Sequence, residues 1–172
     1  NGQEKSIQAL VRRNKLQTKI AEEKADGIKK VAIEEVDRYI DDPLFLAGVS
    51  LYWAEGYKRG AFGSKWKCVD FVNADPAMVR LMMRFFREIC GIDELVFRAQ
   101  LIAHRNVNIG HAVGYWSRIT GIPPERFIKT NVSIRKKDAN LKNKRKSIIL
   151  PNGTLHVRID DVRVFFRIIG WI

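Results

Sequence analysis

The sequence has little cysteine and no long apolar run. Cys68 and Cys90 are its only cysteines and form no C-x-x-C pair, so neither a disulfide framework nor a thiolate zinc site is indicated. No stretch of about 18 apolar residues occurs, and no basic helix has the broad apolar face of a membrane anchor. A glycine-rich phosphate loop, a Ser or Cys nucleophile arrangement and a dinucleotide fingerprint are also missing. Membrane proteins and several large enzyme classes are therefore disfavoured.

No secretory signal precedes the chain, so we expect a cytoplasmic protein. The sequence begins at Asn1 without a methionine, as a fragment or a processed chain would. Its 172 residues suit one domain with an appendage, and a hydrophobic content of 46% indicates a folded core. We divide the chain into a helical arm, residues 1–42, and a main domain, residues 43–172.

Positive charge is in excess and unevenly distributed. The net charge is +12, which for a small domain indicates a polyanionic partner. Residues 1–42 carry no net charge, whereas two short segments hold most of the excess and contain a single acid, Asp138. The first contains Lys58, Arg59, Lys65 and Lys67. The second runs from residue 129 to 146 and includes Lys129, Arg135, Lys136, Lys137, Lys144 and Arg145. We interpret both as phosphate-contacting segments.

Hydrophobic periodicity and capping signals predict an α+β fold. One or two amphipathic helices cover residues 1–42, with Gly27 as a plausible break. Further helices are expected at 43–56, 76–90 and 109–120 and at the C-terminus, and strands at 67–73, 95–103, 128–135 and 155–159. Pro151-Asn152-Gly153 predicts a hairpin turn between residues 148–150 and 155–159. The strands alternate apolar and polar residues, so we expect a mostly antiparallel sheet with helices on one face only.

The polar strand positions predict a DNA-binding surface on the other face. They combine groups that bind phosphate with groups that read base edges. These positions are Arg98, Gln100, Lys129, Asn131, Ser133, Arg135, Thr154, His156 and Arg158. A sheet face of this kind can lie in a DNA groove. RNA remains an alternative, although no aromatic pair alternates onto this face as a stacking platform for single strands.

The segment Gly48-Val49-Ser50-Leu51-Tyr52-Trp53-Ala54-Glu55-Gly56 forms an apolar helix that ends in an acid. Ser50 and Ala54 are small residues four apart, which allows another helix to approach closely. Glu55 opposes both the dipole of a helix C-terminus and the attraction of phosphate to a basic surface. A bound divalent cation would resolve that conflict.

This segment resembles the motif of the LAGLIDADG homing endonucleases. Leu51, Ala54 and Gly56 match motif letters, Ser50 stands for the small glycine, and Glu55 for the metal-binding acid, while Gly48-Val49 and Trp53 depart from the pattern. The resemblance implies the family's saddle fold over residues 43–172, and a homodimer packed through Gly48, Ser50, Leu51 and Ala54. It also implies Mg²⁺ or Mn²⁺ held by Glu55 of both subunits and cleavage of double-stranded DNA.

Glu55 is the only catalytic residue that the resemblance carries over, and Lys65, Lys67 and Gln100 are candidates for arranging water or charge near the cut phosphates. The same features fit two alternatives. The first is a regulator that binds DNA without cutting it, and the second is an RNA-binding splicing accessory.

Overall fold

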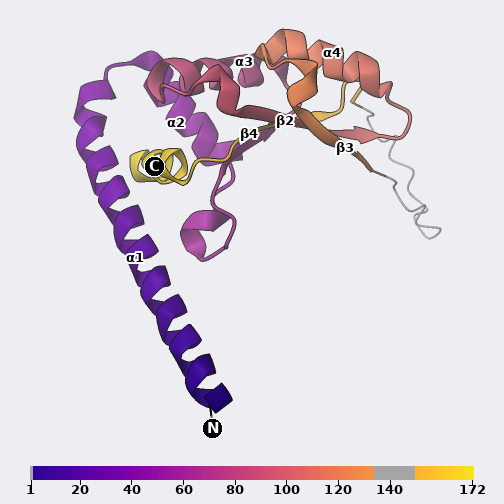
Figure 1. Ribbon diagram of the computed structural model, residues 1–172. Coiled ribbons are helices and arrows are strands. Elements are labelled where there is room, and N and C mark those ends of the chain that lie inside the picture. Colours follow the sequence, from indigo (N-terminus) through magenta and orange to yellow (C-terminus); the bar gives the residue numbers. More distant parts are fainter. Residues whose placement is uncertain (1, 134–149) are drawn as a thin grey trace, which may run out of the picture.

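The computed structural model describes residues 2–133 and 150–172 (Figure 1). The helices are α1 (Gly2–Tyr39), α2 (Pro43–Glu55), α3 (Pro76–Arg84), α4 (Ile109–Thr120) and α5 (Val162–Trp171). The strands are β1 (Val69–Asn73), β2 (Phe97–His104), β3 (Phe127–Ser133) and β4 (Thr154–Ile159). Short 3₁₀ turns are η1 (Arg59–Phe62), η3 (Glu94–Val96) and η4 (Pro124–Arg126), and a π-helical turn, η2 (Phe85–Ile89), continues α3. The protein is thus α+β, as the sequence predicts.

Helix starts follow the capping signals in the sequence. The Asp42 carboxylate accepts hydrogen bonds from the backbone N–H groups of Leu44 and Phe45, and Pro43 takes the first helical position of α2. Asp75 caps α3 in the same way ahead of Pro76. Each cap satisfies backbone donors that the first turn of a helix leaves unpaired. Local chemistry therefore sets where these helices begin.

The four strands form one sheet in the order β1-β4-β2-β3. Within the described residues, β4 pairs antiparallel with β1 and β2, whereas β2 and β3 are parallel. The sheet is therefore mixed, because α4 carries the chain back across it between β2 and β3. Both edges of β4 are occupied by β1 and β2. Residues 148 and 149 of the expected hairpin strand lie outside the described residues, and at the turn the Gly153 N–H is bonded to Leu150 O.

A bulge interrupts the alternation expected in β3. Gln100 pairs with Ile128, but Ile102 pairs with Asn131, so β3 holds one extra residue between these positions. The extra residue turns Ile128 and Asn131 to the same side of the sheet. The sequence predicts that Lys129, rather than Ile128, shares a face with Asn131, and this assignment is therefore wrong.

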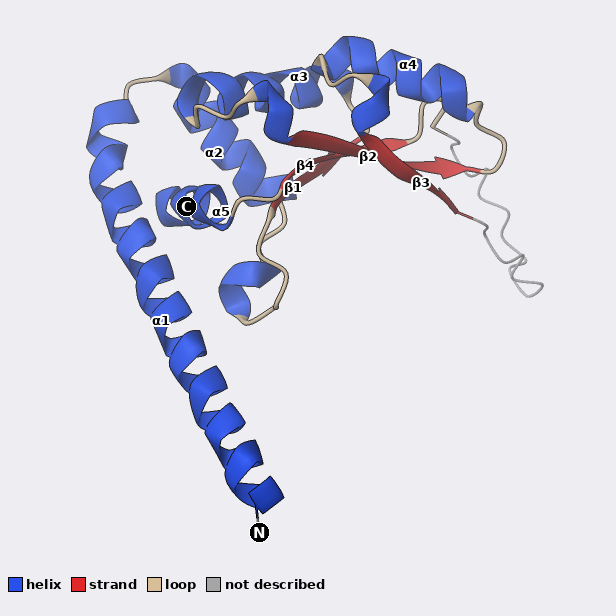
Figure 2. Cartoon of the chain, in the orientation of Figure 1, coloured by secondary structure: helices blue, strands red, loops and turns tan. Residues whose placement is uncertain are grey.

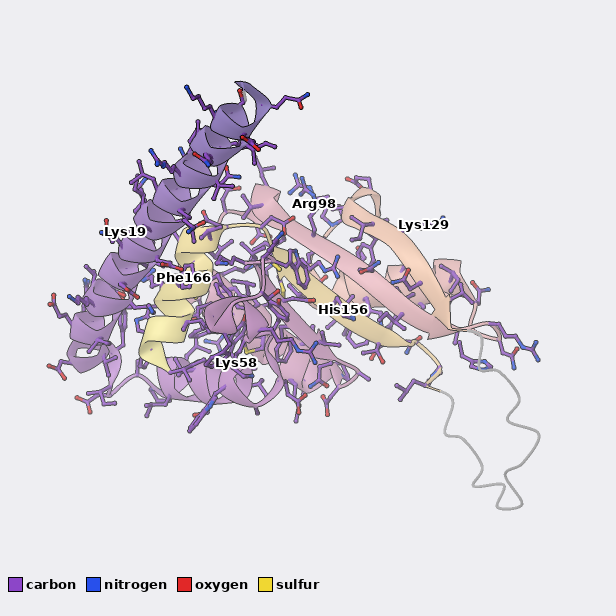
Figure 3. All side chains as sticks on the ribbon, turned by 90° about the horizontal axis from the view of Figure 1, so that it is seen from below. Lys19, Lys58, Arg98, Lys129, His156 and Phe166 are labelled. Atoms are coloured by element: carbon purple, nitrogen blue, oxygen red, sulfur yellow. The ribbon has the colours of Figure 1, made fainter. Side chains whose placement is uncertain are left out.

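Helices cover one face of the sheet and leave the other uncovered. Figure 2 shows α3 and α4 above the strands, with no helix directly beneath β4, β2 and β3. The covered face buries Phe71 of β1, Phe97 and Leu101 of β2, and Val157 of β4. The alternate positions form the opposite side, which we call the open face; it carries Asp70, Val72, Arg98, Gln100, Ile102, Thr154, His156 and Arg158. Figure 3 looks onto this face and shows Arg98, Lys129 and His156 across it.

Helix α1 runs without interruption through Gly27, so the expected break there is wrong. Its C-terminal half packs on α5, where Ala32 is fully buried and an added Cβ at Gly170 would lie 2.7 Å from the Ala32 Cβ. Glu35 accepts hydrogen bonds from Arg167 Nε (2.8 Å) and Trp171 Nε1 (3.2 Å) across this contact. Its N-terminal half projects away from the rest of the molecule (Figure 1). The arm is therefore anchored at one end only.

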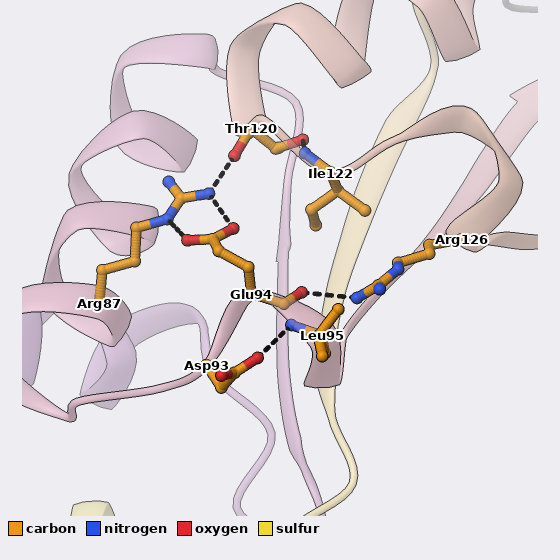
Figure 4. Close-up of polar contacts among 7 residues, drawn as sticks. All are labelled: Arg87, Asp93, Glu94, Leu95, Thr120, Ile122 and Arg126. Carbon is orange, nitrogen blue, oxygen red and sulfur yellow. Dashed lines mark hydrogen bonds and ion pairs between the residues drawn. The ribbon is translucent and has the colours of Figure 1, made fainter.

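Polar contacts fasten the start of β2 to the covering helices (Figure 4). The Arg87 guanidinium pairs with the Glu94 carboxylate and donates to Thr120 O at the end of α4 (2.7 Å). Arg126 Nη1 donates to Glu94 O (2.7 Å). This network joins α4, η2, η3 and η4 around the segment that leads into Arg98. Over the described residues, no helix has the length and apolarity needed to cross a membrane.

Candidate nucleic-acid interface

Polar side chains on the open face come from three neighbouring strands. Asp70 of β1 pairs in register with Arg158 of β4, which in turn pairs with Arg98 of β2. One row further along, His156 lies between Val72 and Gln100. The register therefore brings together four predicted DNA-binding residues that lie up to 60 positions apart in sequence.

Asp70 organises the centre of this face and was missed by the sequence reasoning. Its side chain is only 6% exposed, and both carboxylate oxygens lie 3.1 Å from His156 Nδ1. The Arg158 guanidinium forms an ion pair with it at 3.6 Å, too far for a hydrogen bond, and also lies over the Trp66 ring at 5.1 Å. His156 and Arg158 are thus oriented by contacts within the chain. The sequence signal for Asp70 was an acid in the middle of a predicted strand. Its partners could not be predicted, because they depend on the pairing of β1 with β4.

The remaining DNA-contact candidates on β2 and β3 differ in their exposure and in their hydrogen bonds within the chain. Arg98 is exposed, yet its Nη1 donates to Leu95 O (2.9 Å) and Phe97 O (3.0 Å). Gln100 is half-buried and donates to Lys129 O at 3.0 Å, which ties β2 to β3. The side chains of Lys129 and Asn131 are exposed. Arg98, Lys129 and Asn131 are therefore the predicted contacts on β2 and β3 that are exposed to solvent.

Several predicted contacts are not placed by the structure. Ser133 ends β3 and its backbone pairs with His104. The rest of the second basic segment, Arg135, Lys136, Lys137, Lys144 and Arg145, lies outside the described residues.

The first basic segment, residues 58–67, forms a folded loop that we call the basic loop. It contains η1 and hangs on the open-face side of the sheet (Figure 1). Lys58 Nζ donates to Trp53 O (2.8 Å) and Gly56 O (2.7 Å), and Lys67 Nζ donates to Ser64 O (2.9 Å). Arg59 and Lys65 are exposed and have no side-chain partner among the described residues. Two of the four charges thus stabilise the fold, and two point into solvent.

Glu55 lies at the exposed C-terminal end of α2, beside a recess of about 590 Å³ between the basic loop and the open face. Glu55, Lys58, Arg59, Phe62, Asp70 and His156 are among the residues that line it. The Lys58 ammonium binds the last carbonyls of α2, so it already supplies positive charge at this helix end. The electrostatic conflict that suggested a cation is therefore partly resolved within the chain.

One subunit offers few metal ligands at this place. Asp70 is engaged by His156 and Arg158, which leaves Glu55 as the uncommitted carboxylate of the recess. No group of three His, Cys, Asp or Glu side chains suited to a metal ion occurs in the part of the chain that is described. In the described part of the chain, Glu55 therefore has no second free carboxylate beside it in the recess.

Helix α2 has one face packed in the chain and one face open. Gly48 lies on the packed side, where an added Cβ would sit 2.1 Å from a ring carbon of Phe85, so its predicted place at a subunit interface is wrong. Leu51 is half-buried against the core. Ser50 and Ala54 are exposed, in line with Leu46 and with Trp53, whose side chain is 62% exposed.

We compared the chain with family models, with characterised proteins and with solved structures, and found no match in any of them.

Proposed function

We propose that this protein binds double-stranded DNA in a sequence-specific manner through the open face and the basic loop. The observation that carries the proposal is an uncovered sheet face with Arg98 and Asn131 exposed on it and Lys129 exposed on its edge strand, flanked by a loop whose Arg59 and Lys65 have no partner in the described chain. Guanidinium and ammonium groups suit phosphates, and amides suit base edges. Cations gathered on one face favour a polyanion such as a duplex over single small anions.

We further propose a homodimer through the exposed side of α2, in a LAGLIDADG-like saddle arrangement. Leu46, Ser50, Trp53 and Ala54 form a stripe with helical spacing, and a Trp that is mostly exposed is unfavourable in a monomer. Small residues at Ser50 and Ala54 let two helices approach closely. A two-fold axis parallel to the two helices would bring both copies of Glu55 to the same end of the helix pair.

The dimer would supply a second carboxylate, which the recess of one subunit lacks among the described residues. Glu55 from each subunit would hold Mg²⁺ or Mn²⁺, and the metal would supply activated water and charge stabilisation for phosphodiester hydrolysis. Glu55 is positioned for this role because it lies at the recess between the basic loop and the open face. Lys65, which is exposed in the basic loop, and Gln100 are candidates for arranging the phosphate nearby.

The test compares the native protein with Glu55→Gln, a change of charge at an exposed side chain. A duplex recovered by selection from a randomised pool is assayed by gel shift and then incubated with Mg²⁺ or Mn²⁺. We expect both proteins to bind it and only the native one to cut both strands. If the native protein binds the duplex tightly and never cuts it, the protein is a regulator rather than a nuclease. If structured RNA outcompetes the duplex at equal salt, DNA binding itself is refuted.

A further inference from the structure

Phe62 projects from the molecule to an unusual degree. Its side chain is 84% exposed, more than any other large apolar side chain in the described part of the chain. It lies at the end of η1, at the tip of the basic loop. Transfer of an aromatic ring out of water lowers the free energy. The exposed Phe62 ring would therefore be stabilised by a partner that buries it.

The basic loop is braced so that it cannot fold back over Phe62. Tyr57 Oη lies 2.9 Å from Ser64 Oγ and 3.2 Å from Trp66 O, and the Tyr57 and Trp66 rings are in contact, with centroids 4.8 Å apart. An added Cβ at Gly60 would lie 2.7 Å from Trp66 O and 2.9 Å from the Phe165 ring, so the base of the loop is tightly packed. The backbone that carries Phe62 is therefore held in place by the packed base of the loop, which lowers the entropic cost of insertion into a partner.

The charge around Phe62 indicates the chemistry of that partner. Residues 57–67 include Lys58, Arg59, Lys65 and Lys67 and no acid. Arg59 and Lys65, on either side of Phe62, are the two that have no contact within the described chain. A partner that fits this arrangement offers an apolar surface to the Phe62 ring and negative charge to Arg59 and Lys65 on either side. Stacked bases between phosphate backbones have this combination.

We propose that Phe62 inserts between adjacent base pairs of the bound duplex, unstacks them and bends the DNA. The inference rests on the DNA binding proposed above, since the basic loop lies on the open-face side of the sheet (Figure 1). Arg59 and Lys65 bind the phosphates on either side of the opened step. Insertion of an apolar side chain from a protein bends a duplex by about 20–90°. Target choice then depends on how easily a base step unstacks as well as on base contacts.

The experiment uses the selected duplex with a donor and an acceptor dye at its two ends, and with 2-aminopurine at the central steps. Energy transfer reports bending, and 2-aminopurine fluorescence rises when its stack opens. We compare the native chain with Phe62→Ala, with Phe62→Leu, which keeps an apolar wedge, and with Leu95→Ala, which truncates another exposed apolar residue (65% exposed) in η3. Phe62→Ala removes few contacts in the chain, so its thermal unfolding should match that of the native protein.

We expect bending and unstacking with the native chain, Phe62→Leu and Leu95→Ala, and their loss with Phe62→Ala. The affinity of Phe62→Ala should fall about 5- to 150-fold, the range found when an aromatic side chain that stacks on a base is truncated. Ser64→Ala, which removes one of the two hydrogen-bond partners of Tyr57 Oη and loosens the loop, should reduce the bend with Phe62 still present.

Two results would overturn the inference while leaving the proposed function intact. In the first, the native protein binds the duplex without bending it. In the second, Phe62→Ala bends and unstacks the duplex as the native chain does. If the native protein binds no duplex at all, the proposed function fails at the gel shift, before any bending is measured. If Phe62→Ala loses only self-association in sedimentation, the ring belongs to a protein interface and the inference is wrong.

Discussion

Two of the four cations in the basic loop bind backbone carbonyls and two do not, and this difference leads to a quantitative prediction for DNA binding. Arg59 and Lys65 have no side-chain partner in the described chain, whereas Lys58 and Lys67 bind backbone carbonyls. Two double variants, Arg59→Gln/Lys65→Gln and Lys58→Gln/Lys67→Gln, remove the same charge from the same loop. They differ only in which pair is lost, so each is the control for the other.

The expected magnitude follows from counterion release. Each phosphate contact contributes about 0.9 to the slope of log Kobs against log salt concentration. Loss of Arg59 and Lys65 should therefore lower the slope by about 1.8 per subunit. When the salt concentration rises from about 50 to 200 mM, the affinity of the native protein should therefore fall by a factor about 12 times larger, per subunit, than the affinity of Arg59→Gln/Lys65→Gln. The Lys58→Gln/Lys67→Gln pair should change the slope less.

The assay is a fluorescence anisotropy titration of a labelled duplex at a series of salt concentrations. Thermal unfolding is measured in parallel, because Lys58→Gln removes donors from Trp53 O and Gly56 O at the end of α2. We expect a loss of about 1 kcal/mol of stability there and none for the Arg59/Lys65 pair. Equal slopes for the two double variants would refute the division of roles, and an unchanged slope for both would show that the loop does not touch DNA.

Three further predictions follow from packing. Trp53→Asp should shift sedimentation equilibrium from dimer to monomer, and an unchanged distribution would place the dimer contact elsewhere. Gly48→Ala should lower the free energy of unfolding by about 1–3 kcal/mol through overpacking against Phe85; the loss should be independent of protein concentration and partly reversed by Phe85→Leu. Burial raises the pKa of the Cys68 thiol to about 12, so at pH 8 almost no thiolate forms. Native protein should therefore leave Cys68 unmodified by a thiol reagent that labels it in urea, and rapid native labelling would contradict its burial.

The sequence alone determined the features that depend on neighbours along the chain. Asp42-Pro43 and Asp75-Pro76 start α2 and α3 where the capping signals predict, because a cap bonds to backbone donors two or three residues away. The alternation of Leu155, Val157 and Ile159 with polar residues predicts the two faces of β4, because side chains alternate along any strand. The clustering of charge is likewise visible without coordinates.

Tertiary structure decided which of these groups are available for function. Pairing of β4 with β1 and β2 places Asp70 against His156 and Arg158. Folding of the basic loop commits Lys58 to the end of α2 and leaves Phe62 exposed. These outcomes depend on contacts between residues far apart in sequence, which local periodicity does not encode. The sequence therefore predicts a basic surface, and the fold determines which of its cations and apolar side chains face a partner.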